Sequence, residues 1–467
     1  MAKKSETIFV CNECGFESPK WMGQCICGAW NTFFEERIKP AAVKPSLRGT
    51  ALAKQSSKPS PLDSVVSGSS DRLDTGISEL NRVLGGGLTR GTLTLIAGEP
   101  GIGKSTLILQ AAIKIALQGL TVLYVSGEES AEQIRMRADR VAHPSLLSAV
   151  EGALPSTLLV MPETDIDLIC GAVIESNPGF LIIDSIQTMY SNEISSAAGG
   201  VSQIRACTDI LLRLGKSRNM PVFIVAHVTK AGEVAGPKII EHLVDCVLSF
   251  SGERSRDFRL LTASKNRFGT TSEVGAFEMR EEGLTEITDL SGCLLDGPLG
   301  KTEGTIATAA YEGTRPLLME IQALTASAGT GFPRRSSIGI DAARLNMILA
   351  VLEKKVRLDL SNSDVYINVA SGMKPEGTAA DLAVALAIWS SAKGVVIPDG
   401  VIAIGEIGLA GEIRQIRGAD KIASEAEGLG FTRLILPEKN AKKIKAPAGL
   451  VLTGVSDIRE AIALLQV

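Results

Sequence analysis

The 467-residue chain exceeds the ~100–200 residues usual for one domain, which indicates two large domains and a smaller module. With 45% hydrophobic and 21% charged residues, the composition excludes a disordered chain and favours a globular α/β enzyme. The net charge of −4 excludes a generally cationic surface, so nucleic acid would need locally basic loops or a channel. The start MAKKSETIFV lacks the apolar core of a signal peptide, and no apolar run reaches the ~18 residues of a membrane span. We therefore expect a cytoplasmic protein.

The first predicted element is a small cysteine module in residues 1–36. Four of the eight cysteines form this group: Cys11, Cys14, Cys25 and Cys27. Four soft ligands in a short segment suit one tetrahedral Zn²⁺ bound by thiolates, and a module this small would fold around the metal. Free or redox-active thiols are the alternative. Trp21 and Trp30 flank the second pair, where they would pack the small core or contact a partner or DNA.

A flexible linker and an α/β domain follow the cysteine module. The linker is predicted at 37–64, because the stretch 39–61 is rich in Lys, Ser, Ala and Pro and has no hydrophobic period. In residues 65–285, short β-branched runs alternate with amphipathic stretches, which is typical of a parallel sheet covered by helices. The predicted strands are 92–97, 122–126, 180–184, 222–226 and 244–250, and the predicted helices are 105–118 and 201–214.

A glycine-rich loop joins the first of these strands to the first helix. Its sequence, GEPGIGKST, matches G-x-x-x-x-G-K-[ST] in the strand–loop–helix context that a phosphate-binding loop requires. Backbone N–H groups and the helix N-terminus would cradle phosphates, Lys104 would reach the β- and γ-phosphates, and the Ser105 hydroxyl would bind Mg²⁺. The predicted ATP contacts are Gly98, Glu99, Pro100, Gly101, Ile102, Gly103, Lys104, Ser105 and Thr106.

An acidic residue, Asp184, ends the apolar run FLIID. We expect this strand to neighbour the phosphate-loop strand, where the carboxylate would coordinate Mg²⁺ directly or through water. The alternative is that Asp184 caps the helix that follows.

Two further strand ends carry candidate catalytic groups. Glu128 and Glu129 follow the strand 122–126, where a carboxylate could deprotonate the attacking water. We favour Glu128 as this base, whereas Glu129 could equally cap the helix that begins near Ala131. His227 ends the strand 222–226, and we expect it to sense the γ-phosphate because ligands collect at the carboxyl edge of open α/β sheets.

The order of these motifs resembles the RecA-like ATPases, including ring helicases of the DnaB type, and most closely the RadA (Sms) family of bacterial DNA-repair proteins. The resemblance covers essentially the whole chain, with the motifs CNECG, DRLDTGISELNRVLGGGL, GEPGIGKST, YVSGEES, LIIDSIQT and KNRFG. It implies an α/β fold: a RecA-like P-loop NTPase core with an N-terminal zinc finger and a C-terminal Lon-protease-like domain at 286–467. It also implies a homohexameric ring that encircles single-stranded DNA, hydrolyses ATP between subunits and drives branch migration, with the recombinase RecA as a partner.

The same resemblance implies roles for residues that a plain reading of the sequence would pass over. Lys265 and Arg267 of KNRFG would act on the ATP of the neighbouring subunit, although alone they form only a basic turn. Lys230 and Lys238, in the loop 229–238, would neutralise DNA phosphates, although a mobile connector is the plainer reading. One residue, Ile26, separates the second cysteine pair where the family has two, which leaves open whether this pair holds zinc.

The predicted C-terminal domain, with helices expected at 342–353 and 378–392, has lost the groups of a protease. By order in the motif, Ala379 stands where the Lon-type nucleophilic serine would be, and Asp420, followed by Lys421, stands near the expected lysine. Without the hydroxyl no acyl intermediate forms, so a structural, ring-forming platform is expected. Three arginines would contact DNA phosphates or remain as solvated or inter-subunit charges: Arg334, Arg335 and Arg344.

Two other functions stay open on the sequence. An ATP-dependent protease is disfavoured by Ala379. A KaiC-like, nucleotide-switched assembly protein, which binds partners without moving along DNA, is not excluded by any motif.

Overall fold

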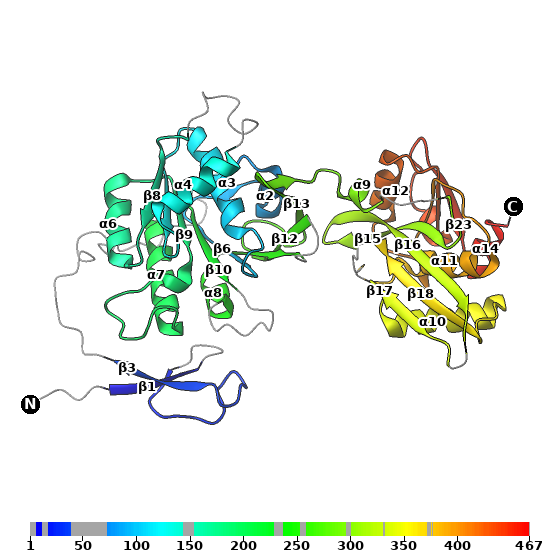
Figure 1. The fold of residues 1–467 in the computed structure, drawn as a ribbon, viewed down its shortest axis with the longest axis horizontal. Coiled ribbons are helices and arrows are strands. Elements are labelled where there is room, and N and C mark those ends of the chain that lie inside the picture. Colours follow the sequence, from blue (N-terminus) through cyan, green and yellow to red (C-terminus); the bar gives the residue numbers. More distant parts are fainter. Residues whose placement is uncertain are drawn as a thin grey trace, which may run out of the picture. The chain divides into compact units, whose positions relative to one another are not determined.

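The computed structural model describes residues 6–11, 17–38, 72–142, 154–227, 237–252, 258–295, 300–329, 332–370, 375 and 377–466. The chain divides into two compact units, residues 1–288 and 289–467, and Figure 1 labels many of their elements.

The cysteine module contains a three-stranded antiparallel sheet of β1 (Glu6–Cys11), β2 (Glu17–Ser18) and β3 (Phe33–Ile38), in the order β2-β1-β3. Its core consists of Cys11, Cys25 and Phe33, with Phe9 packed against them. Trp21 and Trp30 are 53% and 67% exposed, so the expectation that they pack this core is wrong. Among the described residues of the module, the buried cysteines and the two phenylalanines form the interior, and the two tryptophans lie mostly outside it.

A nine-stranded sheet forms the centre of the first unit, in the order β14-β13-β12-β11-β6-β10-β9-β7-β8. The strands from β11 to β8 in this order are parallel, and the three on the other side are antiparallel. The parallel strands are β6 (Leu93–Gly98), β7 (Val122–Ser126), β8 (Leu158–Pro162), β9 (Phe180–Asp184), β10 (Val222–His227) and β11 (Cys246–Ser251). The antiparallel strands are β12 (Phe258–Asn266), β13 (Val274–Arg280) and β14 (Gly283–Glu286).

The expectation that the Asp184 strand neighbours the phosphate-loop strand is wrong. Strand β10 lies between β6 and β9 and pairs with both. All three strands are mainly apolar and buried, as buried parallel strands are, so the local pattern does not specify which of them are adjacent.

Helices cover both faces of this sheet (Figure 1). One face packs against α2 (Ser78–Leu84), α3 (Lys104–Leu117) and α4 (Ala131–Val141). The other face packs against α6 (Ile166–Ser176), α7 (Val201–Ser217) and α8 (Pro237–Leu243). The remaining short elements are β4 (Arg72–Leu73), β5 (Leu88–Thr89) and the 3₁₀ turn η2 (Ile186–Thr188). Two apolar cores therefore hold the parallel strands rigid, and the strand ends present the polar residues.

The second unit contains a seven-stranded mixed sheet in the order β17-β18-β16-β15-β19-β22-β23. Its strands are β15 (Thr305–Glu312), β16 (Arg315–Ser327), β17 (Arg335–Ile338), β18 (Ser363–Val369), β19 (Val401–Ala403), β22 (Arg433–Pro437) and β23 (Val451–Val455), beside the hairpin of β20 (Glu406–Ile407) and β21 (Ile413–Arg414). Its helices are α9 (Leu290–Leu294), α10 (Ala342–Val351), the π-helix η3 (Leu352–Val356), α11 (Asp381–Lys393), α12 (Ala419–Gly428), α13 (Glu438–Ala441) and α14 (Ile458–Ala463). Residues 381–390 of α11 are all buried, as expected for a helix that is apolar around its whole circumference.

Arg344 is engaged inside the second unit. Its guanidinium donates to both carboxylate oxygens of Asp381 and, at 3.0 Å, to the carbonyl of Ile407. Arg335 donates to the carbonyls of Leu360 and Ser363. Arg344 and Arg335 thus make contacts within the unit. The sequence predicts DNA contacts, solvated charges or inter-subunit charges for them instead.

Candidate nucleotide site and cysteine cluster

The phosphate-binding loop connects the end of β6 to the start of α3. Gly101 and Gly103 have φ angles of 77° and 113°, a left-handed region that favours glycine. A Cβ at Gly103 would lie 2.7 Å from the Met279 Cε atom. Because the methionine tip can move aside, the positive φ angle is the main reason that this position favours glycine.

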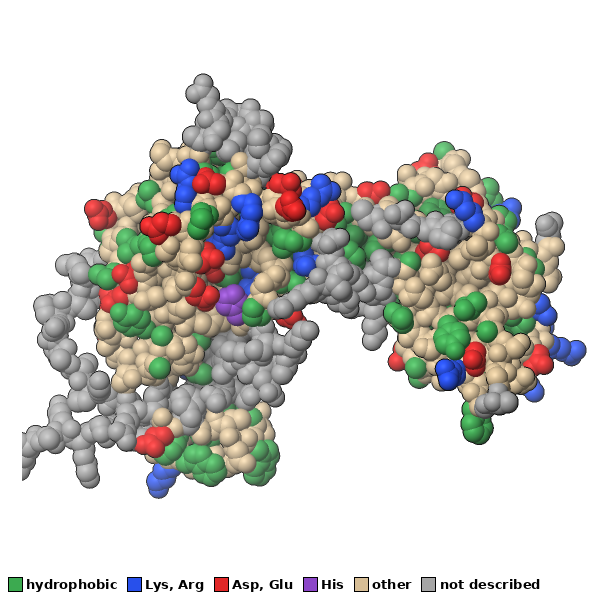
Figure 2. All heavy atoms as spheres, viewed as in Figure 1, with side chains coloured by type: hydrophobic (Ala, Val, Ile, Leu, Met, Phe, Trp, Pro, Cys, Tyr) green, Lys and Arg blue, Asp and Glu red, His purple; other side chains and the backbone are tan. Residues whose placement is uncertain are grey.

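The loop borders a cavity of about 390 Å³ that collects residues from several strand ends. Its lining comprises Pro100, Gly101, Gly103, Lys104, Ser105, Thr106, Ser126, Glu128, Glu129, Arg137, Asp184, His227 and Met279. Of the predicted ATP contacts, Gly98, Glu99 and Ile102 do not line it; the carbonyls of Gly98 and Glu99 instead hold Lys104. Figure 2 shows charged side chains and a histidine gathered on one face of this unit.

Lys104 is buried at the centre of the site. Its Nζ donates to the carbonyls of Gly98 at 2.9 Å and Glu99 at 3.0 Å, and lies 3.1 Å from His227 Nδ1. Burial lowers the pKa of Lys104 to about 8, against the opposing charges of Asp184 and Glu128. Burial and the Lys104 charge also lower the pKa of His227. The imidazole is therefore neutral at neutral pH, and its Nδ1 can accept a hydrogen bond from the ammonium group.

The two neighbouring glutamates have different partners. Glu128 Oε1 accepts a hydrogen bond from the Ser185 hydroxyl at 2.7 Å and lies 3.7 Å from His227 Nε2. Glu129 forms an ion pair with Arg137 at 2.6 Å. The residue that caps α4 is Ser130, in a capping box with Gln133, so the alternative in which Glu129 caps this helix is wrong. Glu129 is committed to Arg137, whereas Glu128 faces the histidine.

Asp184 belongs to a buried hydrogen-bonded chain. Its Oδ2 accepts from the Tyr124 hydroxyl at 2.5 Å, and that hydroxyl accepts from Arg137 Nη2 at 3.2 Å. Burial, together with the Asp184 charge, raises the pKa of Tyr124 well above its usual value, so it stays a phenol that can donate. Asp184 is not the N-cap of the following turn, because η2 begins after Ser185.

Sequence reasoning missed Tyr124 and Arg137. A hydroxyl in the middle of the apolar run VLYVS is a usable signal, because a buried tyrosine hydroxyl needs a hydrogen-bond partner. No local pattern marks Arg137, whose role depends on the packing of α4 against α3 and β8, which brings its side chain to Tyr124.

The KNRFG motif lies at the opposite end of the sheet from the phosphate-binding loop. Asn266 of β12 pairs with Cys246 of β11, which pairs with Thr94 near the start of β6, whereas the loop follows the end of β6. At ~3.3 Å per residue, this places the motif roughly 15 Å away along the strand. Lys265 Nζ donates to the Glu241 carbonyl at 2.7 Å, and Arg267 Nη1 lies 3.1 Å from Asp245 Oδ1. Neither Lys265 nor Arg267 lines the cavity beside the phosphate-binding loop.

Of the two lysines predicted to contact DNA, the structure describes only the backbone of Lys238. Lys230 lies outside the described residues. Lys238 belongs to α8, but its side chain lies outside the described part of the chain.

The cysteine cluster has a geometry that fits zinc. The sulfur atoms of Cys11, Cys25 and Cys27 all lie within 4.8 Å of one another, and those of Cys11 and Cys27 are 3.9 Å apart. Tetrahedral Zn²⁺ with ~2.3 Å bonds requires sulfurs about 3.8 Å apart. Cys14 lies outside the described residues. The shortened Cys25–Cys27 spacing still brings both sulfurs to one point, because the chain turns with Gly28 N–H bonded to the Cys25 carbonyl.

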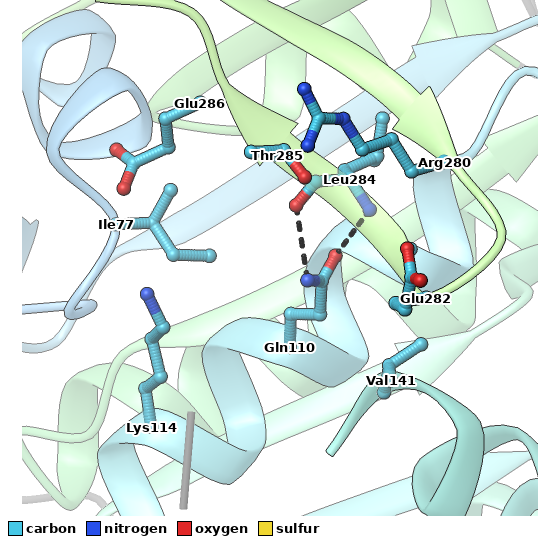
Figure 3. Close-up of a pocket in the computed structure, with 10 residues that line it drawn as sticks. Ile77, Gln110, Lys114, Val141, Arg280, Glu282, Leu284, Thr285 and Glu286 are labelled. Atoms are coloured by element: carbon cyan, nitrogen blue, oxygen red, sulfur yellow. Dashed lines mark hydrogen bonds between the residues drawn. The ribbon is translucent and has the colours of Figure 1, made fainter. Parts of the chain in front are cut away.

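A second cavity of about 400 Å³ lies behind the phosphate-loop helix (Figure 3). Gln110 of α3 spans it and bonds both backbone groups of Leu284 at 3.0 and 3.1 Å. Lys114 donates to the Gly76 carbonyl, and Glu286 accepts from the Glu79 N–H. The Gln110 contacts tie the β13–β14 hairpin to α3, and the Glu286 contact ties it to α2. The same hairpin carries Met279 into the first cavity.

The two positions of the missing protease dyad are occupied by Ala379 and Asp420. Ala379, just before α11, offers only its backbone carbonyl, which accepts from Gly405 N–H at 2.8 Å. Asp420 and Lys421 are exposed on α12.

Three family models match parts of the chain. An AAA domain matches residues 57–233, a rubredoxin metal binding domain matches 9–35, and the subunit ChlI of Mg-chelatase matches 337–440. These matches and the two sheets confirm the predicted fold class, a RecA-like P-loop core between a zinc-binding module and a Lon-like domain.

Curated relatives match nearly the full length. The DNA repair protein RadA of Bacillus subtilis is 46% identical over 98% of both chains, and that of Halalkalibacterium halodurans is 44% identical over 99% of both. The RadA protein of Listeria monocytogenes is 43% identical, again over 99% of both chains. Among solved structures, the ATPase domain of G40P aligns with 46% of this chain and 91% of that chain, at 14% identity and a TM-score of 0.40. None of the helices described is long and apolar enough to cross a membrane.

Proposed function

The chain belongs to the RadA family of DNA repair proteins, and on that premise we propose that it is a DNA-dependent ATPase of recombinational repair. We propose further that it works in the cytoplasm as a hexameric ring motor that drives branch migration on single-stranded DNA. One observation carries the proposal: a single cavity joins the phosphate-binding loop to Asp184, Glu128 and His227. These are the groups that phosphoryl transfer to water requires.

The residues of the cavity divide the work of ATP hydrolysis. Lys104 would leave its carbonyl partners for the β- and γ-phosphates, where its charge stabilises the transition state. The Ser105 hydroxyl and the Asp184 carboxylate are oxygen donors of the kind that Mg²⁺ prefers, and both line the cavity. Bound there, Mg²⁺ would neutralise developing phosphate charge. Tyr124 and Arg137 hold Asp184 in orientation, and His227, bonded to Lys104, would sense the γ-phosphate.

Glu128 is the proposed general base, and its neighbour offers a matched control. We expect Glu128→Gln to lower kcat by about 10²-fold or more, because an amide cannot take the proton of the attacking water. Glu129→Gln should have a much smaller effect, since Glu129 is paired with Arg137. Steady-state ATP hydrolysis of both variants checks this. A larger loss for Glu129→Gln would reverse the assignment.

The KNRFG motif supports a ring. Because Lys265 and Arg267 lie roughly a strand's length from their own phosphate-binding loop, they can reach ATP only if it is bound by another subunit. A head-to-tail ring places one subunit's motif at the next subunit's site. We assign Arg267 the role of an arginine finger there, with Lys265 beside it.

Single-stranded and branched DNA are the proposed partners, together with the recombinase RecA. Lys230 and Lys238 of six subunits would line a central channel, which is how a chain with net charge −4 could hold a polyanion. We assign residues 1–36 to the zinc module and 37–64 to a linker. We assign 65–285 to the motor and 286–467 to a proteolytically inactive platform.

The experiment that tests this proposal measures ATP turnover with and without single-stranded DNA at one fixed low salt concentration, because phosphate contacts are salt-sensitive. A branched substrate is followed in parallel. We expect DNA to raise kcat severalfold and branches to be extended only with ATP. Turnover indifferent to DNA, without extension, would instead favour a KaiC-like switch.

A further inference from the structure

Asp245, the residue before β11, connects the proposed arginine finger to the strand that carries the subunit's own phosphate-binding loop. Its Oδ1 lies 3.1 Å from Arg267 Nη1, and its Oδ2 accepts from the Leu93 N–H at 3.2 Å. Its backbone N–H donates to the Leu93 carbonyl, and its carbonyl accepts from the Arg267 N–H, at 3.0 and 3.1 Å. Both carboxylate oxygens, the N–H and the carbonyl of Asp245 therefore contact either Leu93, where β6 begins, or Arg267.

We propose that Asp245 is a positioning residue that holds Arg267 in the orientation needed to reach ATP in the neighbouring subunit. The inference rests on the proposed function of Arg267 in that site. Asp245 itself lies outside the nucleotide cavity, because it is not among the residues that line that cavity.

Burial makes the contact a strong constraint. The Asp245 side chain is 5% exposed, whereas that of Arg267 is 54% exposed. A buried carboxylate is stable only when it is paired and hydrogen-bonded, so Asp245 holds one edge of the guanidinium. Arginine has five N–H donors, and a single Nη1 contact leaves others to meet a phosphate. One side of the finger is therefore anchored while the other remains exposed.

Asp245 also lets two cations lie close together. Burial and the Arg267 charge lower the pKa of Lys265, whereas Asp245 and Glu241 oppose that shift. The carboxylate thereby offsets the repulsion between Lys265 and Arg267 and favours the charged form of Lys265.

Asp245→Asn separates this role from a purely structural one. The amide oxygen can still accept from the Leu93 N–H, so the start of β6 keeps its hydrogen bond. The amide nitrogen replaces the oxygen facing Arg267 and removes the charge, so the guanidinium loses its anchor. Misplacement of a catalytic group by about 1 Å can cost as much as 10²-fold in rate.

The test is a double-mutant cycle on the full-length protein. kcat and KM for ATP are measured with single-stranded DNA for the wild type, Asp245→Asn, Arg267→Ala and the double variant, and Tm is recorded for each. We expect Asp245→Asn to lower kcat by about 10- to 100-fold with little change in KM, and to cause no further loss when Arg267 is already alanine.

Three outcomes are informative beyond the expected one. Wild-type kcat in Asp245→Asn overturns the inference. An equal fractional loss in both backgrounds also overturns it, because Asp245 would then act independently of Arg267. Wild-type turnover by Arg267→Ala would instead refute the proposed finger itself, and the positioning role with it. If Asp245→Asn has a lower Tm, kcat of all four proteins is measured well below that temperature, so that unfolding does not contribute to the loss of turnover.

Discussion

Lys104→Ala is expected to abolish ATP turnover, with kcat at least ~10³-fold below the wild type. The buried Nζ is the positive charge at the phosphate-binding loop, and its present partners are two carbonyls and His227 Nδ1. Alanine would remove the charge that stabilises the transferring phosphoryl group. Steady-state hydrolysis, with and without single-stranded DNA, measures the loss.

Lys114→Ala is the matched control for this prediction. Lys114 lies on the same helix, α3, but its Nζ donates to the Gly76 carbonyl behind that helix. Lys114→Ala removes the same side-chain atoms as Lys104→Ala but leaves the nucleotide cavity unchanged. Turnover should therefore stay near the wild-type level. Equal activities of the two variants would contradict the assignment of this cavity as the ATP site.

Much of this site could be predicted from the sequence because its signals are local. The phosphate-binding loop is a contiguous motif between a strand and a helix, and the elements β6 and α3 lie where that motif requires. Asp184, Glu128 and His227 each follow an apolar strand run, so their convergence at the carboxyl edge of a parallel sheet follows from topology alone.

The features that the sequence did not reveal depend on contacts between distant segments. Strand β10 separates β6 from β9, and no local pattern distinguishes one buried parallel strand from another. Arg137 reaches Tyr124 and Glu129 because of the way α4 packs against α3 and β8. The sequence predicts a surface cation at Arg344, but in the fold α11 places Asp381 beside it and the two form an ion pair.

Arg267→Ala should leave ATP binding intact and lower kcat by about 10³-fold, the loss typical of a missing arginine finger. The motif lies at the far end of the sheet from the phosphate-binding loop of the same chain, so in the proposed ring Arg267 would act on ATP held by a neighbour. Lys104→Ala subunits provide the decisive complement, because they lack a working loop but keep Arg267. In an equimolar mixture of the two inactive variants, about a quarter of the sites in a head-to-tail ring would combine an intact loop with an intact finger. Turnover should therefore recover on mixing to a comparable fraction of wild type. A mixture as inactive as its components would mean that Arg267 does not act across the interface, since no other arrangement of one loop and one finger restores a complete site.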